Sequence, residues 1–419
     1  MILKPHGEKT PGPFRHIARF VITWYIGLLS LRLAMSSSSA SKPRVLILGG
    51  VGMIGRNLTA YLLENDLCSS IRVVDKMIPI ISYCSPEHTK ALAAVDFQQC
   101  DLAQDAHIVR AFTINEGEQP FDVVINLAAE TRYGLDESVY KQKCFDLSIK
   151  CANATMKMGG CKKYIEVSHG QVYKPSKKPC TETSPIKPWT KHAKHKYQAE
   201  EALRAMVEQG LPLVVLRLAT VYGKADAYGL MPRVVIAAAY KKMDEKMKFL
   251  WGKSLNIATV HVNDVCRAVW HVSGEAGVVG ATYNVADKTN TNQGTVCDML
   301  ANMFDINVGY HGMLISNAAR LKMDYACATA NEKHLEPWND LLKEHGNMNT
   351  NLSPYLDREV LGDKHLSMDG TLIESTGFEY RYPVLTEELL REQVDYAIAQ
   401  KTFPPVIVGG GGGGGETKE

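Results

Sequence analysis

The chain has 419 residues, of which 45% are hydrophobic, 22% are charged and 8% are aromatic. This composition is typical of a globular protein and excludes a wholly disordered or fibrous chain. The 47 basic and 45 acidic residues leave a formal net charge of +2, which gives no electrostatic reason to expect DNA or RNA as a partner. The ten cysteines include no Cys-x-x-Cys pair, so the sequence predicts neither a zinc ribbon nor a dense disulfide framework.

The two ends of the chain differ in composition from its middle. Residues 1–42 contain basic residues, the apolar run Phe20–Leu31 and a serine-rich stretch. The run is shorter than the roughly 20 residues that span a bilayer. We interpret the segment as a mis-extended start with translation from Met35, or as a signal peptide, a weak membrane anchor or a mitochondrial leader. The protein is expected in the cytoplasm, or in mitochondria or at a membrane if the leader is genuine. Residues 406–419 include seven consecutive glycines, which predict a flexible tail.

Between these ends, short apolar runs alternate with amphipathic segments. The expected strands are Arg44–Leu48, Ile71–Val74, Val95–Gln99, Phe121–Asn126, Lys163–Val167 and Leu213–Arg217. The expected helices cover residues 53–65, 104–115, 136–158 and 192–209, where apolar residues have helical spacing. Strands that alternate with helices predict an α/β fold with a doubly wound parallel sheet and helices on both faces.

A glycine pattern follows the first predicted strand directly. The chain reads Gly49-x-x-Gly52-x-x-Gly55, with a helix predicted to begin there. The first glycine permits a tight turn, the second lets a pyrophosphate approach the backbone, and the third lets the helix pack on the sheet. The first turn, which includes Met53 and Ile54, offers N–H groups to the phosphates. The pattern therefore predicts a dinucleotide site.

An acidic residue ends the second predicted strand. Asp75 lies twenty residues after Gly55, where a carboxylate can accept both hydroxyls of an adenosine ribose. The same carboxylate would repel a 2′-phosphate, so the sequence favours NAD over NADP. Lys76 beside it keeps NADP as the less favoured alternative.

At this point the chain resembles the extended short-chain dehydrogenase/reductase family, which contains nucleotide-sugar epimerases and dehydratases and the 3β-hydroxysteroid dehydrogenases. The resemblance covers about residues 44–400 and includes motifs in the expected order: the glycine pattern, Asp101-Leu102, Asn126-Leu-Ala-Ala129, Arg217–Gly223, His261–Asp264 and Tyr283–Val285. It implies that Asp101 and Leu102 lie near the adenine. It also implies that Ala128 and Ala129 flank the cofactor.

The resemblance also implies the domain organisation. A Rossmann core would comprise about residues 43–220 and 260–285, and a smaller mixed C-terminal substrate-binding lobe about 221–259 and 286–405. The family's members often pair through two long helices beside the sheet, so a homodimer through the helices near 104–115 and 136–158 is one expectation. The polar stretch 331–364 has no counterpart in the family and is a candidate for substrate specificity or a partner surface.

The catalytic motif departs from the family pattern. That pattern is a Ser or Thr, with a Tyr and a Lys spaced Tyr-x-x-x-Lys on one helix face. By resemblance, the Lys holds the nicotinamide ribose, and the Tyr exchanges a proton with the substrate hydroxyl while hydride moves. Here Lys196 remains, but the tyrosine position is His192. The hydroxyl position is His169, with Ser168 just before it.

Two functions therefore compete. In the first, the protein performs redox chemistry on a hydroxyl or keto carbon of a small molecule such as a nucleotide sugar, with His192 as the proton-transfer group because imidazole titrates near neutral pH. In the second, it is a catalytically silent NAD-binding structural or regulatory subunit. A metal site at His169, His192 and His195 is a weaker alternative, since no carboxylate or cysteine in helical register completes the ligand set.

Overall fold

The computed structural model describes residues 42–346 and 348–407. Nearly all of the predicted leader and most of the predicted tail lie outside the described residues, so both remain predictions, as does the compartment. Within the described ranges, no helix combines the length and the apolar character needed to cross a membrane.

The centre of the fold is a seven-stranded sheet in the order β10-β6-β5-β4-β1-β2-β3, with every neighbouring pair parallel. The strands are β1 Arg44–Leu48, β2 Ser70–Asp75, β3 Asp96–Gln99, β4 Val123–Asn126, β5 Lys163–His169, β6 Leu213–Leu218 and β10 Thr282–Val285. The predicted parallel sheet is confirmed. The chain winds outward in both directions from β1 and β4, so the carboxyl ends of these two strands flank the crevice where ligands bind in such sheets.

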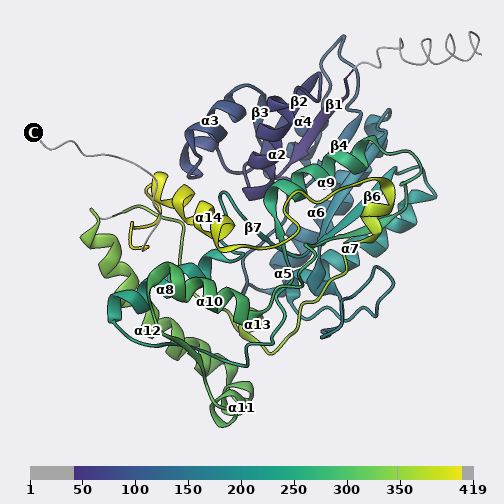
Figure 1. The fold of residues 1–419 in the computed structure, drawn as a ribbon. Coiled ribbons are helices and arrows are strands. Elements are labelled where there is room, and N and C mark those ends of the chain that lie inside the picture. The colour runs from purple at the N-terminus through teal and green to yellow at the C-terminus, as the bar shows by residue number, and fades with distance from the viewer. Residues whose placement is uncertain (1–41, 347, 408–419) are drawn as a thin grey trace, which may run out of the picture. The chain divides into compact units, whose positions relative to one another are not determined.

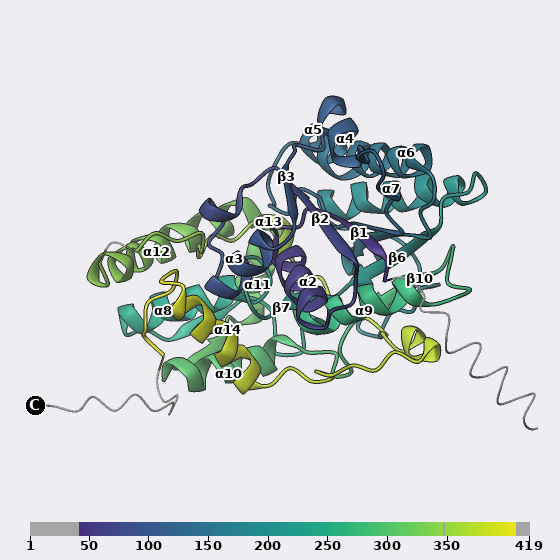
Figure 2. The same cartoon turned by 90° about the horizontal axis from the view of Figure 1, so that it is seen from above.

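Helices cover both faces of the sheet (Figure 2). One face carries α2 Met53–Glu64, α3 Pro86–Ala93 and α9 Val262–Gly274, and the other carries α4 Asp105–Phe112, α6 Leu147–Met158 and α7 Lys191–Val207. Alternate residues of β1 enter the two cores, Val45 and Ile47 on the α2 side and Leu46 and Leu48 on the α6 side. Strands buried on both faces explain why the sequence shows continuous apolar runs.

The helix predicted over 136–158 is built in three parts. It begins as α5 Glu137–Tyr140, widens into the π-helical segment η2 Lys141–Asp146, and continues as α6. Residues at both junctions keep right-handed helical dihedral angles, so the path is continuous. Whether this helix and α4 pair two copies of the chain remains a prediction.

A third core lies in the C-terminal lobe, which is built around helices α8, α10, α12 and α14 (Figure 1). Here Phe403 packs against Trp338 and Phe304, with ring centroids 5.6 and 6.3 Å away, and is fully buried. The helices of this lobe are α8 Met231–Met243, α10 Gln293–Phe304, α11 Met313–Leu321, α12 Met323–Glu344, α13 Arg358–Leu361 and α14 Glu387–Ala399. The remaining short elements of the fold are η1 Pro79–Ile81, η3 Gly170–Val172, β7 Thr220–Tyr222, β8 Met247–Phe249, β9 Thr259–His261, β11 Val308–Tyr310 and η4 Leu372–Thr376. The polar stretch 331–364 begins as a helix, because α12 continues through Pro337 and ends at Glu344.

Candidate active site

The glycine loop connects β1 to α2, and its backbone packs too closely for side chains at some of its positions. A Cβ atom on Gly55 would lie 2.4 Å from the Cα atom of Gly50, so only glycine lets the helix pack this closely. A Cβ atom on Gly52 would approach only the carbonyl oxygen of Gly49, at 3.3 Å. Gly52 therefore leaves one side of the loop open to a bulky anionic group.

The first turn of α2 faces this open side. Gly52 is the N-cap and gives no side-chain hydrogen bond. The N–H of Arg56 donates to the carbonyl of Gly52 at 3.0 Å and forms the first hydrogen bond of the helix. The N–H groups of Met53, Ile54 and Gly55 come before it in the chain, so they have no acceptor within the helix. These N–H groups and the helix dipole suit a phosphate.

Asp75 is anchored beside the same loop. Its carboxylate accepts the N–H of Val51 at 3.0 Å and the N–H of Met77 at 2.9 Å. Burial raises the pKa of the Asp75 carboxyl, and the two N–H groups oppose this shift. Each carboxylate oxygen keeps a lone pair for a ribose hydroxyl. The position fits the adenosine ribose of NAD.

The loops after β3 and β4 complete the predicted cofactor site. The Asp101 carboxylate accepts the N–H of Ala103 at 3.1 Å, while Leu102 is buried in the core below. A Cβ atom on Gly49 would lie only 2.7 Å from the backbone nitrogen of Ala128, so the β4 loop with Ala128 and Ala129 touches the glycine loop. The structure brings the predicted cofactor residues to one edge of the sheet, and their contact with NAD remains a prediction.

The two histidines of the altered motif meet in space. His169 ends β5 and His192 lies in the first turn of α7, with ring centroids 5.6 Å apart and planes at 90°. His169 Nδ1 accepts the N–H of Gln171 at 3.0 Å. His192 is 7% exposed, and its buried Nε2 has no hydrogen-bond partner among the described residues. Burial lowers the pKa of His169 to about 4 and lowers the pKa of His192 well below its usual range. Both imidazoles are therefore neutral at pH 7.

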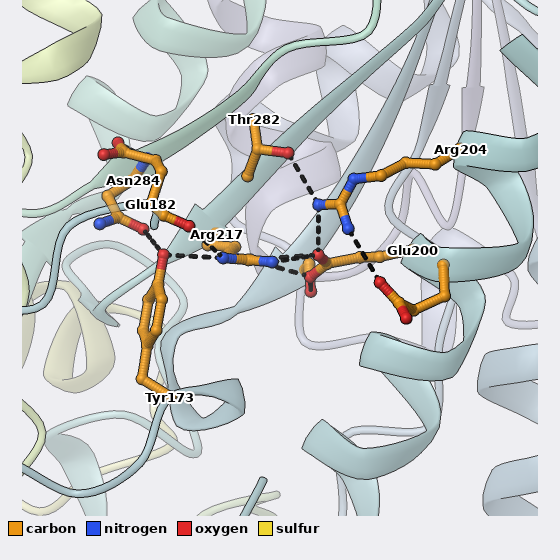
Figure 3. Close-up of polar contacts among 9 residues, drawn as sticks. Tyr173, Glu182, Glu200, Arg204, Arg217, Thr282 and Asn284 are labelled. Atoms are coloured by element: carbon orange, nitrogen blue, oxygen red, sulfur yellow. Dashed lines mark hydrogen bonds and ion pairs between the residues drawn. The ribbon is translucent and has the colours of Figure 1, made fainter. Parts of the chain in front are cut away.

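Ser168 is not brought together with these histidines. Its hydroxyl donates to the Glu200 carboxylate, which also binds the buried guanidinium of Arg217 at 2.6 Å. Figure 3 shows how this pair joins Tyr173 and Arg204 in one network: Arg217 donates to the Tyr173 hydroxyl at 2.9 Å, and Arg204 donates to Glu200 at 3.0 Å. The network ties α7 to β5, β6 and the segment after η3.

Lys196 forms an ion pair with an acid that was not predicted from the sequence. Its Nζ donates to Glu166 of β5 at 2.6 Å, and the two side chains are 3% and 0% exposed. Glu166 also accepts from Asn126 at 2.7 Å and from Ser148 at 2.8 Å. The signal in the sequence was an acidic residue between the apolar residues Ile165 and Val167 of a buried strand, because unpaired charges are almost never fully buried.

His195 has different hydrogen-bond partners from the pair His169 and His192. Its Nε2 lies 3.2 Å from a carboxylate oxygen of Glu137, and its Nδ1 is buried without a partner among the described residues. Within the part of the chain that the structure describes, no three His, Cys, Asp or Glu residues are grouped so that they could hold a metal ion.

A cavity of about 1140 Å³ opens beside Tyr133, which follows β4. Aromatic residues such as Tyr228 and Trp251 line it. It also carries basic side chains, namely Arg132, Arg233, Lys246, Lys248, Lys322 and Lys333, and the acidic residues Glu245 and Asp357. The basic side chains outnumber the acidic ones, so the cavity suits a substrate that carries negative charge.

The low pKa of His169 predicts a pH dependence of stability. Between its usual pKa of 6.5 and the folded value of about 4, the unfolded chain binds a proton that the folded chain does not, so stability falls as the pH falls. The loss approaches about 3 kcal/mol at pH 4 for this one group. We expect His169→Gln to reduce this fall in urea unfolding curves. Above pH 7 the difference between the two proteins should not depend on pH, and an equal acid sensitivity of both would contradict the assignment.

The comparisons with known proteins agree with this geometry. The family model described as the NAD dependent epimerase/dehydratase family matches residues 45–286, more than half of the chain. Over 292 residues the chain is 26% identical to a probable dTDP-glucose 4,6-dehydratase of Sinorhizobium fredii, an alignment that covers 65% of this chain and 80% of that relative.

Solved structures show the same fold. A UDP-glucose 4-epimerase of Thermotoga maritima with UDP-glucose matches with a TM-score of 0.62 and 21% identity, and covers 84% of this chain and 98% of that chain. A UDP-glucose 4-epimerase of Thermus thermophilus in complex with NAD matches with a TM-score of 0.60 and 19% identity over the same shares, 84% and 98%. The predicted Rossmann fold and the resemblance to nucleotide-sugar epimerases and dehydratases are confirmed.

Proposed function

Because the chain belongs to the NAD dependent epimerase/dehydratase family, we propose that it is an NAD-dependent oxidoreductase that acts on a hydroxyl-bearing carbon of a nucleotide-linked sugar. The observation that carries the proposal is the position of His192, whose buried Nε2 lacks a partner among the described residues. This imidazole stands four residues before Lys196, where the family's tyrosine would stand. A neutral imidazole nitrogen without a partner can accept a proton.

The proposed reaction consists of a hydride transfer and a proton transfer. NAD, when bound, supplies the nicotinamide that takes a hydride from the substrate carbon. The hydroxyl on that carbon loses its proton to Nε2 of His192, and the carbon becomes a carbonyl. In the reverse direction the protonated imidazole returns the proton to the oxygen. His192 would thereby take over the proton transfer of the missing tyrosine.

Two features support a nucleotide-linked sugar as the substrate. The cavity beside Tyr133 is about 1140 Å³, and it combines aromatic walls with an excess of basic side chains. A diphosphate requires such positive charge, and a base or a sugar ring can pack on aromatic faces. The solved structure from Thermotoga maritima contains UDP-glucose, which makes this compound the first to test.

One observation favours a second candidate function, a catalytically silent NAD-binding subunit. The Lys196 ammonium is bound by Glu166 in the interior, whereas the family's mechanism needs the lysine at the cofactor ribose. A lysine retained by the core instead of the cofactor would serve stability and not catalysis.

The experiment begins with binding. Thermal unfolding of the purified chain with NAD, NADH and NADP should show stabilisation by NAD and less by NADP. Turnover of UDP-glucose and dTDP-glucose is then followed by product analysis. Failure of every dinucleotide to stabilise the chain would contradict both candidate functions. NAD binding without any turnover would favour the silent subunit.

The role of His192 is tested by substitution. We expect His192→Ala to lower kcat by about 10²-fold or more, because general acid–base groups contribute about 10²–10⁴-fold. NAD binding should be retained, and His192→Tyr, which creates the family's Tyr-x-x-x-Lys spacing, should restore part of the activity. His195→Ala on the same helix is the matched control and should change kcat little. Full activity of His192→Ala would remove His192 from the mechanism.

A further inference from the structure

The family's hydroxyl donor is absent from its usual place in this chain. The position holds His169, whose Nδ1 already accepts the N–H of Gln171 at 3.0 Å. The adjacent Ser168 gives its hydroxyl proton to Glu200. A developing carbonyl or alkoxide oxygen needs at least one well-placed donor, so a hydroxyl from elsewhere is required if the proposed function is correct.

A chain of hydrogen bonds leads from the start of α7 to a different hydroxyl. Thr190 is the N-cap of α7, and its Oγ1 accepts the N–H of Ala193 at 3.1 Å. The Thr190 hydroxyl must therefore direct its proton elsewhere, and it lies 2.8 Å from Oε1 of Gln171. Because Oε1 accepts this bond, the amide nitrogen of Gln171 is turned the other way, and it donates to the hydroxyl oxygen of Tyr133 at 3.3 Å.

The direction of the hydrogen bond from Gln171 to Tyr133 determines whether the Tyr133 hydroxyl can act as a donor. Its oxygen accepts a hydrogen bond from Gln171, so its own O–H remains available to donate. Among the described residues, no acceptor for this O–H is found within hydrogen-bond distance, and Tyr133 lines the large cavity. Gln171 also contacts His169 through its backbone N–H, so one residue connects the tyrosine with the histidine pair.

We propose that Tyr133 is a catalytic residue whose hydroxyl donates a hydrogen bond to the substrate oxygen that becomes the carbonyl. Tyr133 replaces the Ser or Thr hydroxyl that β5 no longer supplies, while His192 exchanges the proton. Thr190 and Gln171 are positioning residues, because they act on the substrate only through the orientation of this hydroxyl. The inference rests on the proposed function.

The charges around Tyr133 fit this role. Asp357, Glu359 and Arg233 are the charged groups that influence its ionisation, and burial raises the pKa of its hydroxyl. The phenol therefore stays protonated at pH 7 and acts as a donor. A partly buried donor held in one orientation stabilises negative charge on an oxygen more strongly than water does.

The test removes one oxygen atom. With NAD bound and UDP-glucose or dTDP-glucose as substrate, Tyr133→Phe should lower kcat by about 10²–10³-fold, the loss seen when one such donor is removed. The KM should change by no more than about threefold, because a bond made mainly in the transition state alters kcat. Tyr61→Phe, which changes a tyrosine of α2 outside this cavity, is the control and should retain activity.

A spectroscopic measurement makes the proposal independent of turnover. In protein labelled with ¹³C at the tyrosine Cζ atoms, the Tyr133 resonance is identified by its loss in Tyr133→Phe. Addition of UDP-glucose or dTDP-glucose to the NAD-loaded protein should shift this resonance and leave that of Tyr61, outside the cavity, less affected. An unshifted resonance with saturating sugar nucleotide, or wild-type kcat in Tyr133→Phe, would overturn the proposal.

The two proposals fail in different ways. If His192→Ala is inactive and Tyr133→Phe is fully active, the proposed function survives and the role of Tyr133 is wrong. If NAD binds and neither sugar nucleotide stabilises or is turned over, the proposed substrate class is wrong, and this role of Tyr133 falls with it. Loss of thermal stability without loss of kcat in Tyr133→Phe would show a purely structural tyrosine.

Discussion

Replacement of Glu200 by glutamine is expected to lower the free energy of unfolding by about 3–5 kcal/mol, the cost of breaking a buried ion pair by removing one partner. Glutamine has the same shape but no charge. The guanidinium of Arg217, whose side chain is 3% exposed, would remain in the interior without its close counter-charge. Equilibrium urea unfolding, followed by circular dichroism, measures the change.

The geometry explains the size of this effect. Nε of Arg217 lies 3.2 and 3.1 Å from the two Glu200 oxygens, and a terminal nitrogen lies 2.6 Å from one of them (Figure 3). Charge-assisted contacts of this planar kind are the strongest hydrogen bonds that side chains form. Arg204, bound to Glu200 at 3.0 Å, also donates to Thr282 of β10 at 2.9 Å, so Arg204 joins α7 to the edge strand of the sheet.

The neighbouring residue provides the control. Glu201 is 57% exposed and lies 3.3 Å from Arg204, and exposed ion pairs contribute about 0–1 kcal/mol. Glu201→Gln should therefore unfold at nearly the same urea concentration as the wild type. Equal midpoints for the two variants would contradict the structural role of the Glu200 network.

The second large effect is expected at Glu166. Glu166→Leu leaves the Lys196 ammonium buried beside β5 without its carboxylate, and we expect a loss of about 3–5 kcal/mol in urea unfolding. The carboxylate also accepts from Asn126 and Ser148, and these donors would lose their partner too.

A double variant separates pairing from packing. Glu166→Leu with Lys196→Met replaces both charges by apolar groups of similar size, an exchange that is often neutral or stabilising. It should recover most of the stability lost in the single variant. Lys194→Met is the control, because Lys194 and Glu137 are 54% and 49% exposed in their 2.5 Å pair, and the expected change is below about 1 kcal/mol. A double variant no more stable than Glu166→Leu would show that the loss has another cause.

The fold could be predicted from the sequence more completely than the candidate site. The central strand Arg44–Leu48 was predicted with its observed bounds, because a strand buried on both faces needs an unbroken apolar run. The glycine pattern was equally direct, since Gly55 meets the backbone of Gly50 at a distance that admits no side chain. Local patterns suffice for features whose physical cause is local.

The unpredicted parts depend on contacts between distant segments. Glu166 could be recognised as unusual between the apolar residues Ile165 and Val167, yet its partner Lys196 lies thirty residues away on α7. Tyr133 had no signal at all, because its proposed role depends on Gln171, which is 38 residues away in the chain. The continuation of α12 through Pro337 was also missed, since proline normally ends a helix and tertiary packing decides the exception.

Phe403 has a consequence for the order in which the protein can be made. Domains usually fold from the N-terminal side as the chain is synthesised, but the third core closes only when Phe403 reaches Trp338 and Phe304. Until then α10 and α12 expose the aromatic side chains that this ring contacts. During synthesis the nucleotide-binding half can therefore be complete while the core of the C-terminal lobe is still incomplete, and the nascent chain is most prone to aggregation or chaperone binding in that interval.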